Sequence, residues 1–194
     1  MALILVGSVL LAAANPAAAQ EAPQLPQTME RVGDWQFECF GVSDDGGPCQ
    51  IYQRVVTGDQ NVVALAAAFT VLADGSVDVQ LAVPLGISLQ LAPQLSLDDE
   101  VATSLPVSRC VSDGCLIEGV LEAGLVDRIG NAEFAQVIVA NTTGQVFPIP
   151  LSLVGFREGM GRLDEVKPEP ALLESDEAAP MEAPEDAASD GDDI

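Results

Sequence analysis

Alternation of apolar and polar residues is the main signal in the middle of the chain, and it predicts β-strands. In the segment DWQFECF, Trp35, Phe37 and Cys39 alternate with polar residues, which places one face in a core and the other in water. The segment CQIYQRVVT, from Cys49 to Thr57, alternates in the same way. Further strands are predicted at 62–72, a continuous apolar run typical of a strand covered on both faces, and at 77–83, 87–91, 96–97, 115–120, 132–140 and 146–154.

A helical pattern occurs once, between two of these strands. Leu121, Leu125, Val126 and Ile129 fall at helical spacing, and Gly130 follows as a C-terminal stop. About ten short strands with turns such as Asp74-Gly75 between them are typical of an all-β domain. We therefore expect a single β-sandwich with one short helix, and a jelly-roll-like or barrel-like arrangement is the alternative.

Both ends of the chain differ in composition from the middle. Residues 1–19 combine an apolar run with a small-residue cleavage pattern, which predicts a signal peptide. Its n-region has no Lys or Arg, so the signal is atypical or the true start lies upstream. Residues 20–28 read as a flexible Pro- and Gln-rich linker, residues 29–163 as the β domain, and residues 164–194 as a disordered acidic tail.

Charge and composition narrow the range of functions. The 194 residues include 30 acids, 7 bases and no histidine, for a formal net charge of −23. A chain this acidic is a poor partner for nucleic acid or for anionic lipid surfaces. The missing histidine removes Ser-His-Asp and Cys-His catalysis and the commonest ligand of transition metals. A membrane anchor is the alternative for residues 1–19, but their apolar run is shorter than the roughly 20 residues that a spanning helix needs. No transmembrane span is expected after cleavage of the signal.

The four cysteines form two close pairs in the sequence, Cys39 with Cys49 and Cys110 with Cys115. In an exported chain an even number of cysteines predicts disulfides, and four cysteines allow three connectivities. We favour the two local bridges, Cys39–Cys49 and Cys110–Cys115, because turn residues lie inside each pair. Zinc binding and C-x-x-C redox chemistry are the alternatives, and the spacing of these pairs is unusual for both.

A set of short motifs follows the predicted strands in a fixed order. They are Gly33-Asp34-Trp35, Cys39, Cys49-Gln50-Ile51, Val83-Pro84-Leu85-Gly86-Ile87 with Leu89, Cys110 and Cys115 with Gly114, Ile149-Pro150-Leu151-Ser152-Leu153 and Gly155-Phe156. The set spans about residues 31–163 and resembles the invasion-associated locus B proteins of alphaproteobacteria. The resemblance implies an exported, all-β protein of the periplasm or the outer-membrane surface. It marks Trp35, Pro84, Leu85, Gly86, Gly114, Gly155 and Phe156 as motif positions, and the acidic tail is not part of it.

A non-enzymatic binding or structural module is the main functional hypothesis, with an unidentified cell-envelope protein or surface component as partner and no cofactor. A binding face would use apolar or aromatic residues near loops, such as Phe40, Tyr52 or Phe156, although each of these is also an ordinary core residue type. Trp35 is expected in the core because it alternates with Phe37. The turn at Pro84–Gly86 serves the fold or a site. The oligomeric state is left open.

Two further hypotheses depend on acidic residues. A carboxylate-based hydrolase could use Asp98, Asp99 and Glu100, or Asp44 and Asp45, although adjacent carboxylates in loops are usually solvated. Weak Ca²⁺ binding could involve Asp44-Asp45-Gly46-Gly47 or the tail residues Asp190, Asp192 and Asp193. A periplasmic protein that binds a small molecule is the remaining alternative.

Overall fold

The computed structural model describes residues 25–41, 47–58 and 62–168. Within these residues the backbone forms eleven strands and two helices. In chain order they are β1 (Thr28–Val32), β2 (Trp35–Cys39), β3 (Cys49–Thr57), β4 (Val62–Val71), β5 (Val77–Val83), β6 (Gln94–Leu97), β7 (Glu100–Ser104), β8 (Val107–Val111), β9 (Gly114–Leu121), α1 (Ala123–Asn131), β10 (Ala135–Ala140), β11 (Val146–Leu151) and α2 (Phe156–Glu165).

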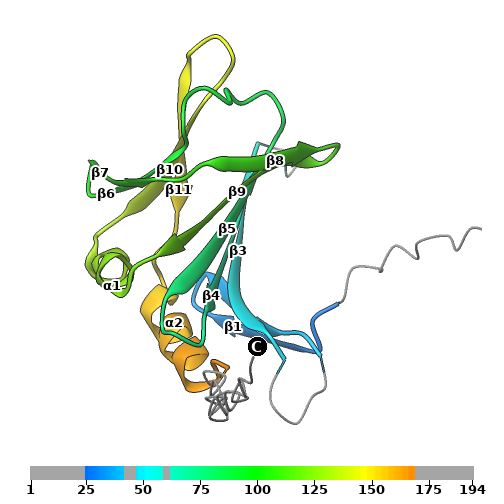
Figure 1. The fold of residues 1–194 in the computed structure, drawn as a ribbon, viewed down its shortest axis with the longest axis vertical. Helices are drawn as coiled ribbons and strands as arrows, with labels where there is room; N and C mark the ends of the chain where they lie inside the picture. The colour runs from blue at the N-terminus through cyan, green and yellow to red at the C-terminus, as the bar shows by residue number, and fades with distance from the viewer. Residues whose placement is uncertain (1–24, 42–46, 59–61, 169–194) are drawn as a thin grey trace, which may run out of the picture.

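The strands form two antiparallel sheets. The larger sheet has the strand order β1-β2-β3-β4-β5-β9-β8, and the smaller one has the order β11-β10-β6-β7. Figure 1 shows the smaller sheet on one side of the larger sheet, with α2 below it and beside β4 and β1. The prediction of an all-β sandwich is therefore confirmed.

The core lies between the larger sheet and the two parts of the chain that cover it, the smaller sheet and α2. Every second residue of the larger sheet points inward, as Leu65, Ala67 and Phe69 do in β4. Trp35, Phe69 and Phe156 pack edge to face, with ring centroids 5.2 to 5.6 Å apart. Since Phe156 is the first residue of α2, this aromatic cluster fixes the helix against β2 and β4.

Helix α2 is the one long element that the sequence pattern did not predict. Phe156, Met160 and Leu163 are spaced like one face of a helix, and all three are buried. Gly159 lies on the same face, and a Cβ there would come within 2.7 Å of the Ile51 side chain. The glycine therefore allows the helix to approach β3 closely, although glycine lowers helix propensity.

An ion pair holds the far end of α2 on the larger sheet. Arg162 lies 2.6 Å from the carboxylate of Glu30 in β1, and its guanidinium lies 4.5 Å from the centre of the Phe37 ring. The hydrogen bond from Arg162 and its charge lower the pKa of Glu30. A lowered carboxyl pKa means that the pair contributes at neutral pH and is lost as acid protonates Glu30.

Two expectations about single elements are wrong. Strand β4 is not covered on both faces, because its outward residues Ala66 and Ala68 are only half-buried; alanine made the apolar run look continuous. The predicted helix is present as α1, but Gly130 lies inside it and does not end it. Helix α1 instead ends at Asn131, where the N–H of the next residue donates to the carbonyl of Arg128.

Some predicted segment limits differ from the bounds of the elements in the structure. Strand β1 begins at Thr28, inside the segment read as a linker, and α2 runs to Glu165, inside the segment read as a tail. The predicted strand 87–91 is reduced to one bridge between Ile87 and Asn141. The signal peptide 1–19 and tail residues 169–194 lie outside the described residues.

Both local disulfides are present. Cys39 pairs with Cys49 across β2 and β3, and Cys110 pairs with Cys115 across β8 and β9, with a Cα–Cα distance of 4.0 Å in each case. All four cysteines are used, so none is left to bind zinc. Gly114 enters the second hairpin with φ of 151° and lies so close to the Val83 carbonyl that a Cβ would come within 2.5 Å of it.

We expect the two disulfides to contribute unequally to the free energy of unfolding. The bridge between Cys39 and Cys49 closes the longer loop, so its replacement by serines should cost about 3 kcal/mol, against about 2 kcal/mol for Cys110 and Cys115. Urea unfolding of the two double variants measures both. Equal losses, or a larger loss for the second pair, would contradict the loop-entropy account.

Candidate functional site

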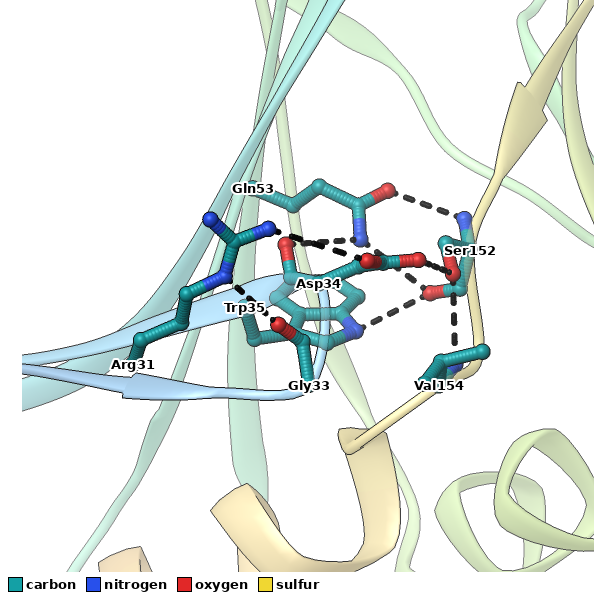
Figure 2. Close-up of polar contacts among 7 residues, drawn as sticks. All are labelled: Arg31, Gly33, Asp34, Trp35, Gln53, Ser152 and Val154. Carbon is teal, nitrogen blue, oxygen red and sulfur yellow. Dashed lines mark hydrogen bonds and ion pairs between the residues drawn. The ribbon is translucent and has the colours of Figure 1, made fainter.

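Three distant segments meet where the smaller sheet ends and α2 begins. They are the turn between β1 and β2, the middle of β3 and the connection from β11 to α2 (Figure 2). The residues involved are called the clasp below: Gly33, Asp34, Trp35, Gln53, Ser152, Val154 and Gly155. Six of these seven belong to the motif segments or directly adjoin them, and Gln53 is the exception.

Gln53 joins the two sheets through its side-chain amide. It is a polar residue in an inward position of β3, and only 5% of its surface is exposed. Its Oε1 accepts a hydrogen bond from the Ser152 N–H at 2.9 Å, and its Nε2 donates to the Ser152 carbonyl at 3.3 Å. The amide therefore pairs with Ser152 as a neighbouring strand would, and the cost of burying it is offset.

Trp35 and Asp34 contact the same residue from the β1–β2 side. The Trp35 indole N–H donates to the Ser152 carbonyl at 2.9 Å, and the Ser152 hydroxyl donates to the Asp34 carboxylate at 2.6 Å. The Asp34 N–H donates to the Val154 carbonyl at 3.0 Å. Figure 2 shows these side chains converging on Ser152, so one residue holds the end of β11 to both β2 and β3.

Two glycines let the backbones of the clasp come close together. Gly33 and Gly155 both have positive φ, 62° and 87°. A Cβ on Gly155 would overlap the Val32 carbonyl oxygen, and a Cβ on Gly33 would overlap the Val154 carbonyl oxygen. Both positions therefore require glycine for conformation and for space.

The edge of β11 changes character along its length. In the antiparallel pair with β10, Pro148 and Pro150 lie opposite Ile138 and Gln136. A proline has no N–H, so these two residues occupy positions whose backbone groups point away from β10 and present only a carbonyl. Beyond the clasp, the edge of β11 that faces β3 and β4 therefore offers acceptors but not donors at these two positions.

A hollow lies beside the clasp, between β3 and the end of β11. Its volume is about 510 Å³. Arg31, Asp34 and Arg54 are the charged residues that line it; the others are Gln53, Val55, Phe134, Ala135, Gln136, Pro150, Leu151 and Ser152. Arg31 also donates to the Gly33 carbonyl and lies 4.0 Å from Asp34. Two arginines thus face this hollow against one carboxylate.

A second hollow continues along the same edge of β11 and is apolar. It has a volume of about 450 Å³ and is lined by Thr57, Val62, Val63, Ala64, Val83, Pro84, Leu85, Ile87, Val139, Asn141, Phe147, Pro148, Ile149 and Pro150. No charged residue belongs to this lining. Pro150 lines both hollows, and together they are called the trough below.

Three further cations are bound by oxygen atoms elsewhere in the described part of the chain. Arg109 pairs with Glu118, Lys167 pairs with Asp164, and Arg157 donates to the Gly130 carbonyl. Within the part of the chain that the structure describes, Arg54 forms no ion pair. In a chain with a formal charge of −23, the first hollow thus has more cations than acids in its lining.

The candidate binding residues named from the sequence separate into three environments. Phe156 is buried in the aromatic core, so it is not a binding residue, and Trp35 is buried as expected. Phe40 is half-buried beside the first disulfide. Tyr52 is half-buried on the outer face of β3, where it shares a smaller hollow with Arg31 and Arg54.

The motif segment Pro84-Leu85-Gly86 turns at the apolar end of the trough. Leu85 is 56% exposed, and it lines this hollow together with Val62 and Phe147, which are 54% and 41% exposed. Gly86 has φ of 100° with open space around it. The turn thus serves the fold and also lines the trough. Sequence reasoning missed Gln53, Ser152, Arg31 and Arg54 as site residues.

The acidic cluster proposed for catalysis is a tight hairpin turn. Asp98 and Asp99 are the two central residues between β6 and β7, and both have positive φ, as a type I′ turn requires. The Asp98 carboxylate accepts from the N–H groups of Glu133 and Phe134, so it ties this turn to the start of β10. Glu100 is exposed.

The acidic segments proposed for Ca²⁺ binding cannot be placed in the fold. Asp44, Asp45, Asp190, Asp192 and Asp193 all lie outside the described residues. In the described ranges, no group of three His, Cys, Asp or Glu residues is arranged to hold a metal ion. Nor does any helix among those ranges have the length and apolar character needed to cross a membrane.

Comparisons with known proteins agree on one family. The sequence model of the family described as "Invasion associated locus B (IalB) protein" matches residues 35–164. Two invasion protein B homologues of Brucella abortus, from strain 2308 and from biovar 1 strain 9-941, are each 27% identical over 135 residues, which is 69% of this chain and 78% of theirs. The crystal structure of invasion associated protein B from Bartonella henselae superposes on this chain with a TM-score of 0.65 and 24% sequence identity. The match covers 72% of this chain and 97% of that one, and it shows that the two share a fold.

Replacing Gly155 and Gly75 should separate the stability cost of lost close packing from the cost of a strained backbone conformation. Gly75 has a similar φ of 83° but nothing within 4 Å of its Cβ position, so Gly75→Ala is the matched control. We expect Gly75→Ala to lower the free energy of unfolding by about 1–2 kcal/mol through φ alone. Gly155→Ala should cost more than about 4 kcal/mol or prevent folding. Equal losses in urea unfolding would mean that the close approach is unimportant.

Replacing Gln53 should loosen the join between the sheets. In Gln53→Ala the half-buried Ser152 N–H loses its partner, so we expect a loss of about 2 kcal/mol in the free energy of unfolding, measured by heat or urea. Gln80→Ala is the control, since Gln80 lies in the same sheet but is exposed and bonds only to Asp78. It should change stability by less than about 0.5 kcal/mol. A Gln53 variant as stable as the control would contradict the proposed role.

Proposed function

Because this chain belongs to the invasion associated locus B family, we propose that it is an exported cell-envelope protein that works as a non-enzymatic binding module. Its place would be the periplasm or the outer membrane. The trough between β11 and the larger sheet carries this proposal, because it is the hollow that the family-motif segments build from both sides. Asp34 and Ser152 line one half, and Pro84 and Leu85 line the other.

The shape and lining of the trough support binding. Ligand sites are concave and mostly apolar, with a few polar groups that fix orientation. The trough fits this description, since its apolar half adjoins a half with two arginines and the clasp amide of Gln53. Leu85, Val62 and Phe147 expose apolar surface there without another part of the described chain to cover it. Such surface is typical of a binding site.

The disulfides support export. Disulfides persist in oxidising compartments such as the periplasm and are rare in the cytosol of mesophiles. Both bridges here join neighbouring strands, and Cys110 is exposed. An exposed bridge of this kind would be open to reduction in the cytosol.

The position of the acids supports a binding role over hydrolysis. The Asp98 carboxylate is occupied by two backbone N–H groups, and Asp34 accepts the Ser152 hydroxyl. A carboxylate pair that attacks a bond across a cleft needs two carboxyl groups about 5–10 Å apart with room for substrate between them. Asp34 is the one acid in the lining of the trough, so this arrangement does not form there.

Photo-crosslinking in living cells tests the proposed function. A photoreactive benzoylphenylalanine in place of Leu85 should yield a reproducible adduct with an envelope component. The same group in place of Val120, which is 61% exposed on the outer face of β9, is the control and should not give that adduct. Identical adducts from both positions, no adduct at position 85, or recovery of the protein in the cytosolic fraction would contradict the proposal.

A further inference from the structure

The two halves of the trough differ in a way that indicates the chemistry of a ligand. One end is positive and the other is uncharged and apolar, and both lie along one strand edge. We propose that the trough binds an amphiphile of the fatty-acid type, with its anionic head at Arg31 and Arg54 and its acyl chain along β11 toward Leu85. This inference rests on the proposed binding function and names its ligand class.

The positive end has the groups that an anionic head requires. Arg31 and Arg54 both line the first hollow, at the edge where it adjoins the smaller hollow that they share with Tyr52. Arg54 has no ion-pair partner within the described residues. Asp34 is the one acid in this lining, and its carboxylate already accepts the Ser152 hydroxyl. The lining therefore carries a net charge of +1. A guanidinium binds a carboxylate through two parallel hydrogen bonds, so even one free arginine can hold the head.

The apolar end fits a chain that makes no hydrogen bonds. Its lining has Thr57 and Asn141 as polar side chains and is otherwise aliphatic, aromatic or proline. Val62, Leu85 and Phe147 project partly into solvent there, and a hydrocarbon chain would remove their apolar surface from water. From Phe147 to Ser152 the strand spans five residue steps, which is about 17 Å at 3.4 Å per residue. A linear amphiphile with a long acyl chain matches this length.

A peptide strand matches the trough less well. A strand added to β11 would need backbone donors and acceptors in alternation, but Pro148 and Pro150 supply carbonyls only. Gln53 already occupies the backbone groups of Ser152 at the end of the edge. A second copy of this chain is also disfavoured, because each copy carries a formal charge of −23.

Fluorescence titration tests the inference on the purified full-length exported chain with its disulfides intact. The probe is dansyl-undecanoate below its micelle concentration, with palmitate and the uncharged hexadecanol as competitors. We expect saturable binding and competition by palmitate that is about tenfold stronger than competition by hexadecanol, because a charge-assisted hydrogen bond is lost with the alcohol.

Matched variants locate the two ends of the ligand. Arg54→Gln should lower the affinity for palmitate about tenfold and leave the affinity for hexadecanol unchanged, which removes the preference for the anion. Arg128→Gln is its control, since Arg128 is exposed but lines a different hollow, beside Gly124 and Leu125. Leu85→Ser should weaken the binding of both competitors. Val120→Ser, on the outer face of β9, should change the binding of neither. Circular dichroism confirms that each variant is folded.

Several results would overturn the inference. Absence of saturable binding would do so, and so would binding that Arg54→Gln and Leu85→Ser leave unchanged. If the lipid probe does not bind but crosslinking at position 85 captures an envelope protein, the proposed function stands and the ligand class is wrong. If neither the probe nor a crosslinked partner is found, both proposals fail.

Discussion

The attachment of β11 to the larger sheet depends on the backbone of Ser152. Its carbonyl accepts from Trp35 and Gln53, and its N–H donates to Gln53, so the backbone of a single residue is bonded to both β2 and β3. Trp35 in turn packs against Phe69 and Phe156, which couples this hydrogen-bonded join to the aromatic core and to the start of α2. Because backbone groups buried in an interface must be paired, a polar glutamine in the core is the condition for joining the two sheets here.

The same join explains why the trough is open. The smaller sheet is fixed to β3 at Ser152, but toward Phe147 the edge of β11 meets β4 without a ladder between them. Pro148 and Pro150 make such a ladder incomplete, since neither can donate a hydrogen bond. The prolines also protect this edge from pairing with other strands. The space between β11 and the larger sheet is therefore left to side chains that present apolar surface, and this surface is what a ligand would cover.

Local patterns predicted the strands but not the contacts between them. The alternation around Trp35 and Ile51 placed the correct faces inward, and the same alternation puts Gln53 inward, which was the available signal for its role. Helix α2 was missed because Gly159 and Gly161 argue against a helix, whereas packing on Ile51 requires a small residue at 159. The trough joins β3 to β11, about a hundred positions apart, and no local pattern reports such a distance.

The charged residues of the trough all lie at one of its two ends. The acids outnumber the bases by more than four to one in the sequence, so a site that holds an anion needs more cations than acids in its lining. Here two arginines from different strands, Arg31 from β1 and Arg54 from β3, face the single carboxylate of Asp34, which is held by the Ser152 hydroxyl. Because the clasp fixes the relative positions of these strands and of β11, it also fixes the distance between the positive and the apolar end. The residues that hold the fold together would thus also determine which ligands fit the proposed site.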